Sequence, residues 1–300
     1  MPRQVHLTAC QTVTITTVVD NSADALLPST PHLRRWPLAD CPLLAEPGLA
    51  LHVQASAQGR TYQLLLDAGA TRQALPYNLP RLGLDARQLD ALILSHGHPD
   101  HVAAVLDLLG LANHPLPVVV HPAAFRAPGG EQDGAASSLD RRSWELAGAQ
   151  LVESAEPLLV GPALISGSIP RQAEPGGTPL ATSWPEPVPD EQALVFKLAS
   201  KGLVVITGCG HAGLLNILRH AQELTGVQRI YAVVGGFHLG RAPAQLVDHT
   251  IAALKALRPE VLLPAHCTGS EALERLMAAL PGQCLRNSVG SALTLGAAPG

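Results

Sequence analysis

The chain has 300 residues, a hydrophobic fraction of 47% and a formal net charge of −4. This is enough apolar material for a sizeable core, and the acidic balance argues against a nucleic-acid-binding protein that works through a broad basic face. The sequence has no apolar run of about 18 residues and no basic start followed by a signal-peptide stretch, so we expect no membrane contact and a cytoplasmic location. The five cysteines are scattered without C-x-x-C spacing, which argues against a disulfide framework.

The predicted elements alternate between strands and helices along the whole chain. Residues 12–19 are rich in β-branched side chains and predict a strand, and a hairpin is expected around the turn Gln58-Gly-Arg60. Proline and glycine content predicts long loops at about 22–48, 122–143 and 170–190. The other predictions are helices at 71–82, 102–110, 214–224 and 243–257, a short pair of strands within 158–166, and strands at 49–57, 62–66, 91–94, 117–121, 193–198, 202–207, 230–234, 261–263 and 288–295.

The densest group of metal-ligating side chains follows the apolar run 91–94. His96, His98, Asp100 and His101 fall within six positions. Residues two apart in an extended segment point the same way, so His96 and His98 can bind one ion while Asp100 and His101 turn toward a second. Chance would place an H-x-H-x-D-H pattern in roughly one sequence in a thousand of this composition, so a two-metal site is favoured over a polar loop that is merely rich in histidine.

Two later histidines follow predicted strand ends. His211 lies in a glycine-flanked turn at the start of the helix predicted at 214–224, where a helix N-terminus favours the neutral imidazole that binds metals. His266 follows the strand predicted at 261–263. The expected metal ligands are therefore His96, His98 and His211 for one divalent ion, and Asp100, His101 and His266 for the other.

Several phrases of the sequence together resemble one branch of the metallo-β-lactamase superfamily. They are Val18-Val-Asp-Asn21, Leu94-Ser-His-Gly-His-Pro-Asp-His101, Ser168-Ile-Pro-Arg171, Asp190-Glu-Gln-Ala193, Thr207-Gly-Cys-Gly-His-Ala-Gly213, Gly235-Gly-Phe-His-Leu239 and His266-Cys-Thr-Gly269. The branch is the metal-dependent hydrolase group that includes the archaeal 7,8-dihydropterin-6-yl-methyl-4-(β-D-ribofuranosyl)aminobenzene 5′-phosphate synthases. The resemblance covers about residues 10–296 and implies one α/β domain over 1–300, folded as a four-layer αββα sandwich.

The resemblance also implies roles for two residues beside the ligands. Asp67 closes an apolar strand, where a carboxylate is costly unless it is paired. It would either hold a ligand imidazole from behind the metal loop or cap the helix predicted at 71–82. Cys209 stands roughly where most members of the superfamily carry a metal-bridging aspartate. It would serve either as a thiolate ligand or as a structural cysteine.

Three residues are candidates for contact with the substrate. Asp20, in the first of the phrases above, is assigned to substrate binding. Arg171 is either an anion clamp or a solvated charge, and the backbone amides of the turn at 208–213 could join it in cradling an anionic group. His238 follows a strand end and is either a proton donor or substrate contact, or a packed histidine. Asp100 would also orient the nucleophile.

The leading hypothesis is a binuclear metallohydrolase in which a metal-activated water attacks a small substrate that carries phosphate. Zinc is the first expectation, with manganese or iron as alternatives. The resemblance also admits a transferase that joins a dihydropterin diphosphate to an aminobenzene riboside phosphate and displaces diphosphate. A third hypothesis is a metal-holding protein that binds a small molecule without turnover. The sequence leaves open whether the protein forms a homo-oligomer.

Overall fold

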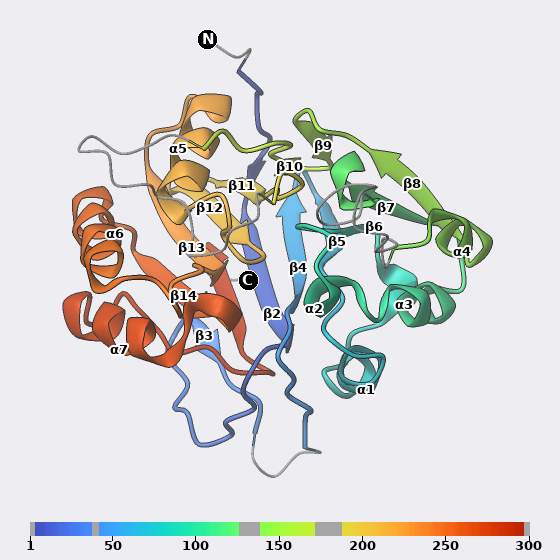
Figure 1. The fold of residues 1–300 in the computed structure, drawn as a ribbon, viewed down its shortest axis with the longest axis horizontal. Coiled ribbons are helices and arrows are strands. Elements are labelled where there is room, and N and C mark those ends of the chain that lie inside the picture. Colours follow the sequence, from blue (N-terminus) through green and yellow to red (C-terminus); the bar gives the residue numbers. More distant parts are fainter. Residues whose placement is uncertain (1–3, 38–41, 126–138, 172–187, 297–300) are drawn as a thin grey trace. The chain divides into compact units, whose positions relative to one another are not determined.

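The computed structural model describes residues 4–37, 42–125, 139–171 and 188–296 (Figure 1). They form two compact units, each with its own sheet: the first unit is Met1–Ala9 with Glu156–Arg286, and the second is Cys10–Ala155 with Asn287–Gly300. Residues 38–41, 126–138 and 172–187, in the middle of the three predicted long loops, lie outside the described residues. A single domain over 1–300 stays a prediction.

The first unit is built on a sheet whose described strands follow the order β14 (Val261–Ala265), β13 (Ile230–Gly236), β12 (Gly202–Thr207), β11 (Leu194–Leu198), β10 (Ala163–Ile165) and β9 (Leu158–Val160), with β1 (Ala9–Cys10) beside β11. β12, β13 and β14 pair in parallel, and the other neighbours along this path pair antiparallel. Aliphatic side chains of the sheet pack against α5 (Leu214–Thr225), α6 (Ala244–Leu257) and α7 (Ser270–Ala279). Because the three parallel strands end at the same edge, the turns that follow them lie together.

The second unit is built on a sheet in the order β3 (Leu33–Arg34), β15 (Ala292–Gly296), β2 (Thr12–Val19), β4 (Ala50–Ala57), β5 (Arg60–Leu66), β6 (Ala91–Ile93), β7 (Leu116–Val120) and β8 (Ala149–Glu153). Its core is formed with α1 (Ala74–Arg81), α3 (Val105–Ala112) and α4 (Arg141–Leu146). β5 to β8 pair in parallel. The metal loop, residues 95–101 with the H-x-H-x-D-H motif, follows β6 and therefore lies at one edge of this sheet. No helix in the described residues combines the length and the apolar character needed to cross a bilayer.

The mixed α/β class with two sheets is confirmed, and so are most predicted elements. The hairpin at Gln58-Gly-Arg60 forms as expected, because Gln58 and Gly59 both adopt positive φ (51° and 78°). The helix predicted at 102–110 is wrong in its bounds, since it is divided between α2 (Pro99–Val102) and α3. α3 continues past Gly110 and ends where Asn113 adopts φ 54° and donates its backbone N–H to the Leu109 carbonyl.

His52 is a histidine in the core of the second unit. It lies on β4 between Thr16 of β2 and Leu65 of β5, and 1% of its surface is exposed. Burial lowers the pKa of His52 from 6.5 to about 4, while the side chain of Gln63 acts in the opposite direction. The imidazole is therefore neutral in the folded protein over a pH range in which the unfolded chain takes up a proton.

Replacing His52 with leucine is expected to reduce the fall in the free energy of unfolding as the pH decreases. In the native chain, stability is complete above pH 6.5 and falls as the pH decreases toward 4, by about 3 kcal/mol from this residue alone. Urea unfolding at a series of pH values across this window measures the slope. The same substitution at the exposed His32 is the control and should leave the slope unchanged. Equal slopes in the native chain and the His52 variant would contradict the prediction.

Candidate metal centre

The H-x-H-x-D-H loop brings its four predicted ligands together within the second unit. It follows β6 and continues into α2. His96 and His101 are buried, whereas His98 and Asp100 are partly exposed. The ring centroid of His96 lies 4.6 Å from that of His98 and 4.2 Å from that of His101, and Nε2 of His101 lies 3.7 Å from the Asp100 carboxylate. Two imidazoles are thus fixed in the interior and two ligands face outward.

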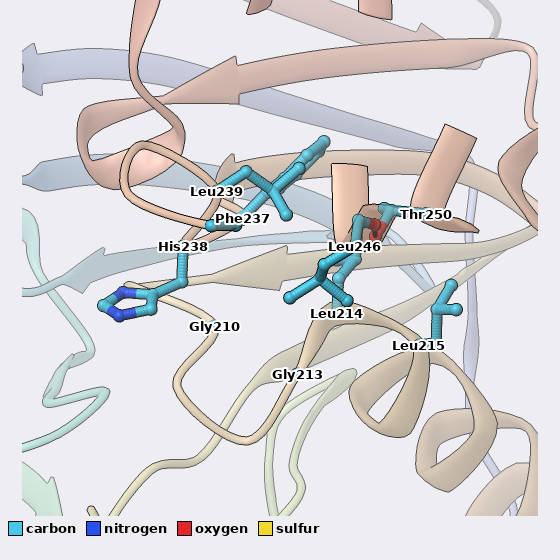
Figure 2. A pocket seen from close by; sticks show the side chains of 10 residues that line it. Gly210, Gly213, Leu214, Leu215, Phe237, His238, Leu239, Leu246 and Thr250 are labelled. Carbon is cyan, nitrogen blue, oxygen red and sulfur yellow. Dashed lines mark hydrogen bonds between the residues drawn. The ribbon is translucent and has the colours of Figure 1, made fainter. Parts of the chain in front are cut away.

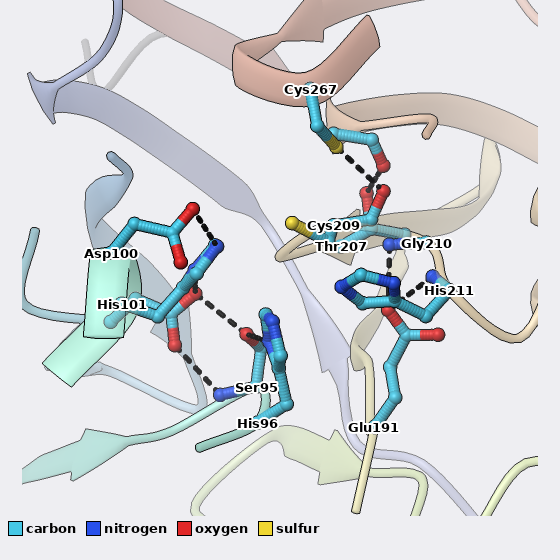
Figure 3. Close-up of polar contacts among 12 residues, drawn as sticks. Ser95, His96, Asp100, His101, Glu191, Thr207, Cys209, Gly210, His211 and Cys267 are labelled. Atoms are coloured by element: carbon cyan, nitrogen blue, oxygen red, sulfur yellow. Dashed lines mark hydrogen bonds and ion pairs between the residues drawn. The ribbon is translucent and has the colours of Figure 1, made fainter. Parts of the chain in front are cut away.

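A single carboxylate organises the buried half of this loop. Asp67 is fully buried and accepts hydrogen bonds from the backbone N–H and the hydroxyl of Ser95, each at 2.7 Å. Its Oδ2 also lies 2.7 Å from Nδ1 of His101. The Ser95 hydroxyl lies 2.8 Å from Nδ1 of His96 (Figure 3). Asp67 therefore contacts one predicted ligand directly and the other through Ser95.

The network fixes the tautomers of both imidazoles. An ionised carboxylate only accepts hydrogen bonds, so the proton between Asp67 and His101 sits on Nδ1 of His101. The single hydrogen of the Ser95 hydroxyl points to Asp67, so this oxygen must accept from Nδ1–H of His96. In the neutral form of each ring, Nε2 then carries the lone pair, which is the form that binds a metal.

The helix-capping alternative for Asp67 is wrong, because α1 begins at Ala74 and no side chain accepts a hydrogen bond at its N-cap, Gln73. The turn that precedes the helix is held by Glu46. Its Oε1 accepts from the backbone N–H of Ala70 at 2.8 Å and of Thr71 at 3.1 Å, and its Oε2 accepts from the Thr71 hydroxyl. Glu46 lies in the proline-rich stretch 22–48, far from this turn in sequence. Nothing local to the sequence pointed to it.

The other two predicted histidine ligands lie in the first unit, at the carboxyl ends of its parallel strands. His211, buried, follows β12, and His266, partly exposed, follows β14. The ring of His211 lies 4.3 Å from that of His238, which follows β13. Since His211 and His266 belong to one unit and the metal loop to the other, their sharing of metal ions stays a prediction.

Cys209 and Cys267 lie at the same edge of the first unit. Sγ of Cys267 donates a hydrogen bond to the Cys209 carbonyl at 3.1 Å. Burial, the largest single influence, raises the pKa of the Cys267 thiol. The contacts with Cys209 and His238 and the charges of His266 and His238 outweigh it, so the pKa lies well below its ordinary value. The sequence singled out Cys209 through the family resemblance, whereas Cys267 was notable only as the neighbour of the candidate ligand His266.

The turn at 208–213 does bind an anionic group, but the group belongs to the protein. Glu191 is buried, and its carboxylate accepts from the backbone N–H groups of Gly210 and His211, each at 2.6 Å, and of Ala212 (Figure 3). These three amides are therefore bonded to Glu191, which removes them from the set that was expected to cradle an anionic substrate group. Burial raises the pKa of Glu191, and the three N–H donors and the charge of Arg171 oppose that effect.

The predicted substrate contacts are found in different surroundings. Asp20 is buried and accepts from the backbone N–H of Asn21 at 2.7 Å and from Nδ2 of Asn287 at 2.8 Å. The Arg171 guanidinium donates to the Val188 carbonyl at 2.9 Å. Their roles in substrate binding stay predictions, since both positions are also explained by these structural contacts.

His238 lines a small apolar cavity of about 20 Å³ in the first unit. Figure 2 shows its imidazole pointing away from the apolar side chains that form the rest of the lining, among them Phe237, Leu214 and Leu246. The volume holds about one water molecule, so the cavity is too small for a substrate. His238 therefore presents its ring outside this cavity and is not packed within it.

Comparison with known proteins agrees with this architecture. The family model described as the Metallo-beta-lactamase superfamily matches residues 58–221, more than half of the chain. The 7,8-dihydropterin-6-methyl-4-(beta-D-ribofuranosyl)-aminobenzene-5'-phosphate synthase of Methanocaldococcus jannaschii is 26% identical over 257 residues, which cover 79% of this chain and 85% of that protein.

Two solved structures show the same fold. A metal-dependent hydrolase of the beta-lactamase superfamily is similar with a TM-score of 0.68 and 24% identity, over 96% of this chain and 100% of its own. The metallo-beta-lactamase fold protein YhfI from Bacillus subtilis is similar with a TM-score of 0.52 and 14% identity, over 95% of this chain and 100% of its own. With the matched family model, the two-sheet fold and the histidine loop at the end of β6, the chain belongs to the metallo-beta-lactamase superfamily.

Proposed function

We propose that this protein is a metal-dependent hydrolase that holds two divalent ions and acts on a small substrate that carries phosphate. The observation that carries the proposal is the network of Asp67 and Ser95, which leaves Nε2 of two buried histidines ready to bind a cation. Such orientation of ligand imidazoles by a carboxylate is the usual support of a metal site. The proposed ligands are His96, His98 and His211 for one ion, and Asp100, His101 and His266 for the other.

The chemistry follows from this donor set. Two divalent ions bound there would lower the pKa of a water molecule and polarise an electrophilic phosphorus or carbonyl group. In this proposal Asp100 orients the nucleophile, and His238 donates a proton to the leaving group. Arg171 binds the anionic part of the substrate. The nitrogen and carboxylate donors suit zinc first, with manganese or iron as alternatives.

Removal and return of metal tests the proposal. The purified chain should contain at least two equivalents of divalent metal per chain by elemental analysis. Treatment with a chelator should abolish hydrolysis of phosphomonoesters or phosphodiesters, and zinc or manganese should restore it. Replacing His96 with alanine should lower the metal content and reduce activity by more than about tenfold, whereas the same change at the exposed His32 should do neither. Full activity in the metal-free protein would contradict the proposal.

A transferase is the second candidate, and the similarity to the archaeal synthase favours it. The same ligands would then hold ions that stabilise a departing diphosphate. Incubation with a dihydropterin diphosphate and an aminobenzene riboside phosphate should give a condensed product and free diphosphate, both detectable by mass spectrometry. If the metal-loaded protein turns over neither these compounds nor a panel of phosphoesters, thioesters and lactams, yet retains a small molecule, it is a binding protein.

A further inference from the structure

Cys209, His238 and Cys267 converge at one edge of the first unit's sheet. They follow three neighbouring parallel strands, β12, β13 and β14. Each offers a sulfur or a ring nitrogen, and these three atoms lie within 4.8 Å of one another. All three residues belong to the first unit, so their meeting does not depend on the second.

Gly236, at the end of the middle strand, makes this meeting possible. β12 and β14 both pair with β13, so they lie about 10 Å apart, and a side chain at the end of β13 would separate the residues that follow them. A Cβ added at Gly236 would lie 2.7 Å from Sγ of Cys267, 3.0 Å from Cα of Cys209 and 2.4 Å from the Gly208 carbonyl. The space above β13 is therefore occupied by the two cysteines.

Backbone contacts hold the three residues in place. Sγ of Cys267 donates to the Cys209 carbonyl at 3.1 Å, and the Cys267 carbonyl accepts from the N–H of Gly240 at 3.0 Å. His238 adopts φ 51°, in the left-handed region that residues other than glycine seldom occupy. Such strained conformations persist only where surrounding contacts impose them, and they concentrate at binding and catalytic sites.

We propose that Cys209, His238 and Cys267 form a binding site for a thiophilic metal ion such as Zn²⁺. Two sulfurs and one imidazole are a ligand set that Zn²⁺ accepts, and three protein ligands leave a fourth position open to water or to a ligand atom. The sulfurs select against Mg²⁺ and Ca²⁺, which require oxygen ligands. All three ligands belong to the first unit, and the site does not rest on the function proposed above. With an ion bound here, His238 serves as a ligand and not as the proton donor of that function.

Cobalt spectroscopy on the full chain tests this site. After removal of metal with a chelator, titration with Co²⁺ should give an absorption band from sulfur-to-cobalt charge transfer. Cys267→Ser should lose about half of the band, because one of two thiolates is removed, and should bind Co²⁺ at least about tenfold more weakly. Cys284→Ala, which removes another buried cysteine of the same unit, should keep the full band. His96→Ala should also keep it.

Three results would overturn the site: no band in the native chain, a band of unchanged intensity in Cys267→Ser, or a band that disappears in His96→Ala. The last result would assign the sulfur to an ion held by the histidine loop. Failure of the hydrolase proposal gives a different result: the protein would not turn over phosphoesters, but the cobalt band would still be present.

Alkylation of the native chain tests the site without any substitution. Cys267 is partly exposed, so iodoacetamide should label it, and mass spectrometry can follow the rate. Zn²⁺ should slow this labelling at least about tenfold in the native chain and in His96→Ala, whereas Mg²⁺ should not slow it. Labelling at the same rate with and without Zn²⁺ would overturn the site.

Discussion

Replacing Asp67 with asparagine is expected to lower the free energy of unfolding by about 3 kcal/mol and to weaken metal binding by about 10- to 100-fold. The buried carboxylate accepts from two groups of Ser95 and from His101. An amide accepts at its oxygen alone. Its NH₂ group would face an N–H or O–H donor, and turning it toward His101 would force the imidazole into the tautomer that cannot present Nε2. Urea unfolding and zinc competition titration measure the two effects.

The Asp67→Asn change can be interpreted without a backbone effect and has a matched surface control. Asp67 adopts φ 62°, and asparagine tolerates the left-handed region as well as aspartate, so the substitution adds no backbone strain. Asp107→Asn removes a carboxylate that pairs with Arg72 on the surface of the same unit, and should cost less than about 1 kcal/mol. Similar losses in the two variants would show that the Asp67 network has no special role.

Replacing Glu191 with alanine is expected to lower the free energy of unfolding by about 3 kcal/mol or more, because three backbone donors in a buried turn lose their acceptor at once. Two of those donors belong to Gly210 and His211, so the position of the His211 ring should become variable. Zinc binding should weaken together with stability. Urea unfolding and metal analysis measure the two effects.

The Glu191→Gln variant distinguishes the effect of side-chain volume on stability from the effect of the carboxylate. It keeps the volume of Glu191 but places an NH₂ group among N–H donors, so it should recover only part of the lost stability. Glu223→Ala, at an exposed position of the same unit, is the matched control and should change stability by less than about 0.5 kcal/mol. A Glu191→Ala variant as stable as this control would contradict the prediction.

The parts of the structure that were predictable are those decided by neighbouring residues. β2 forms over the predicted 12–19 because its β-branched side chains alternate between two faces, and the metal loop is local because its four ligands are adjacent in sequence. α4 and β8 were missed. α4 has only six residues beside a glycine-rich stretch, and its start depends on Asp140, whose side chain accepts from the N–H of Arg142.

The contacts that support the site depend on the order of strands in the sheet, which cannot be read from the sequence. Glu191 is recognisable as the acceptor of the turn at 210–212 only once β11 and β12 are known to pair. In the same way, Cys267 meets Cys209 across 58 positions because β13 lies between β12 and β14 and ends without side chains. Order of strands in a sheet, and not periodicity along them, decides both contacts.

The partners that hold Asp67 are a backbone amide, a hydroxyl and an imidazole that is uncharged in its metal-binding form. A cation on the far nitrogen of His101 would supply the missing counter-charge through the ring. Folding and metal binding would then be thermodynamically coupled, so that each bound ion also stabilises the native state.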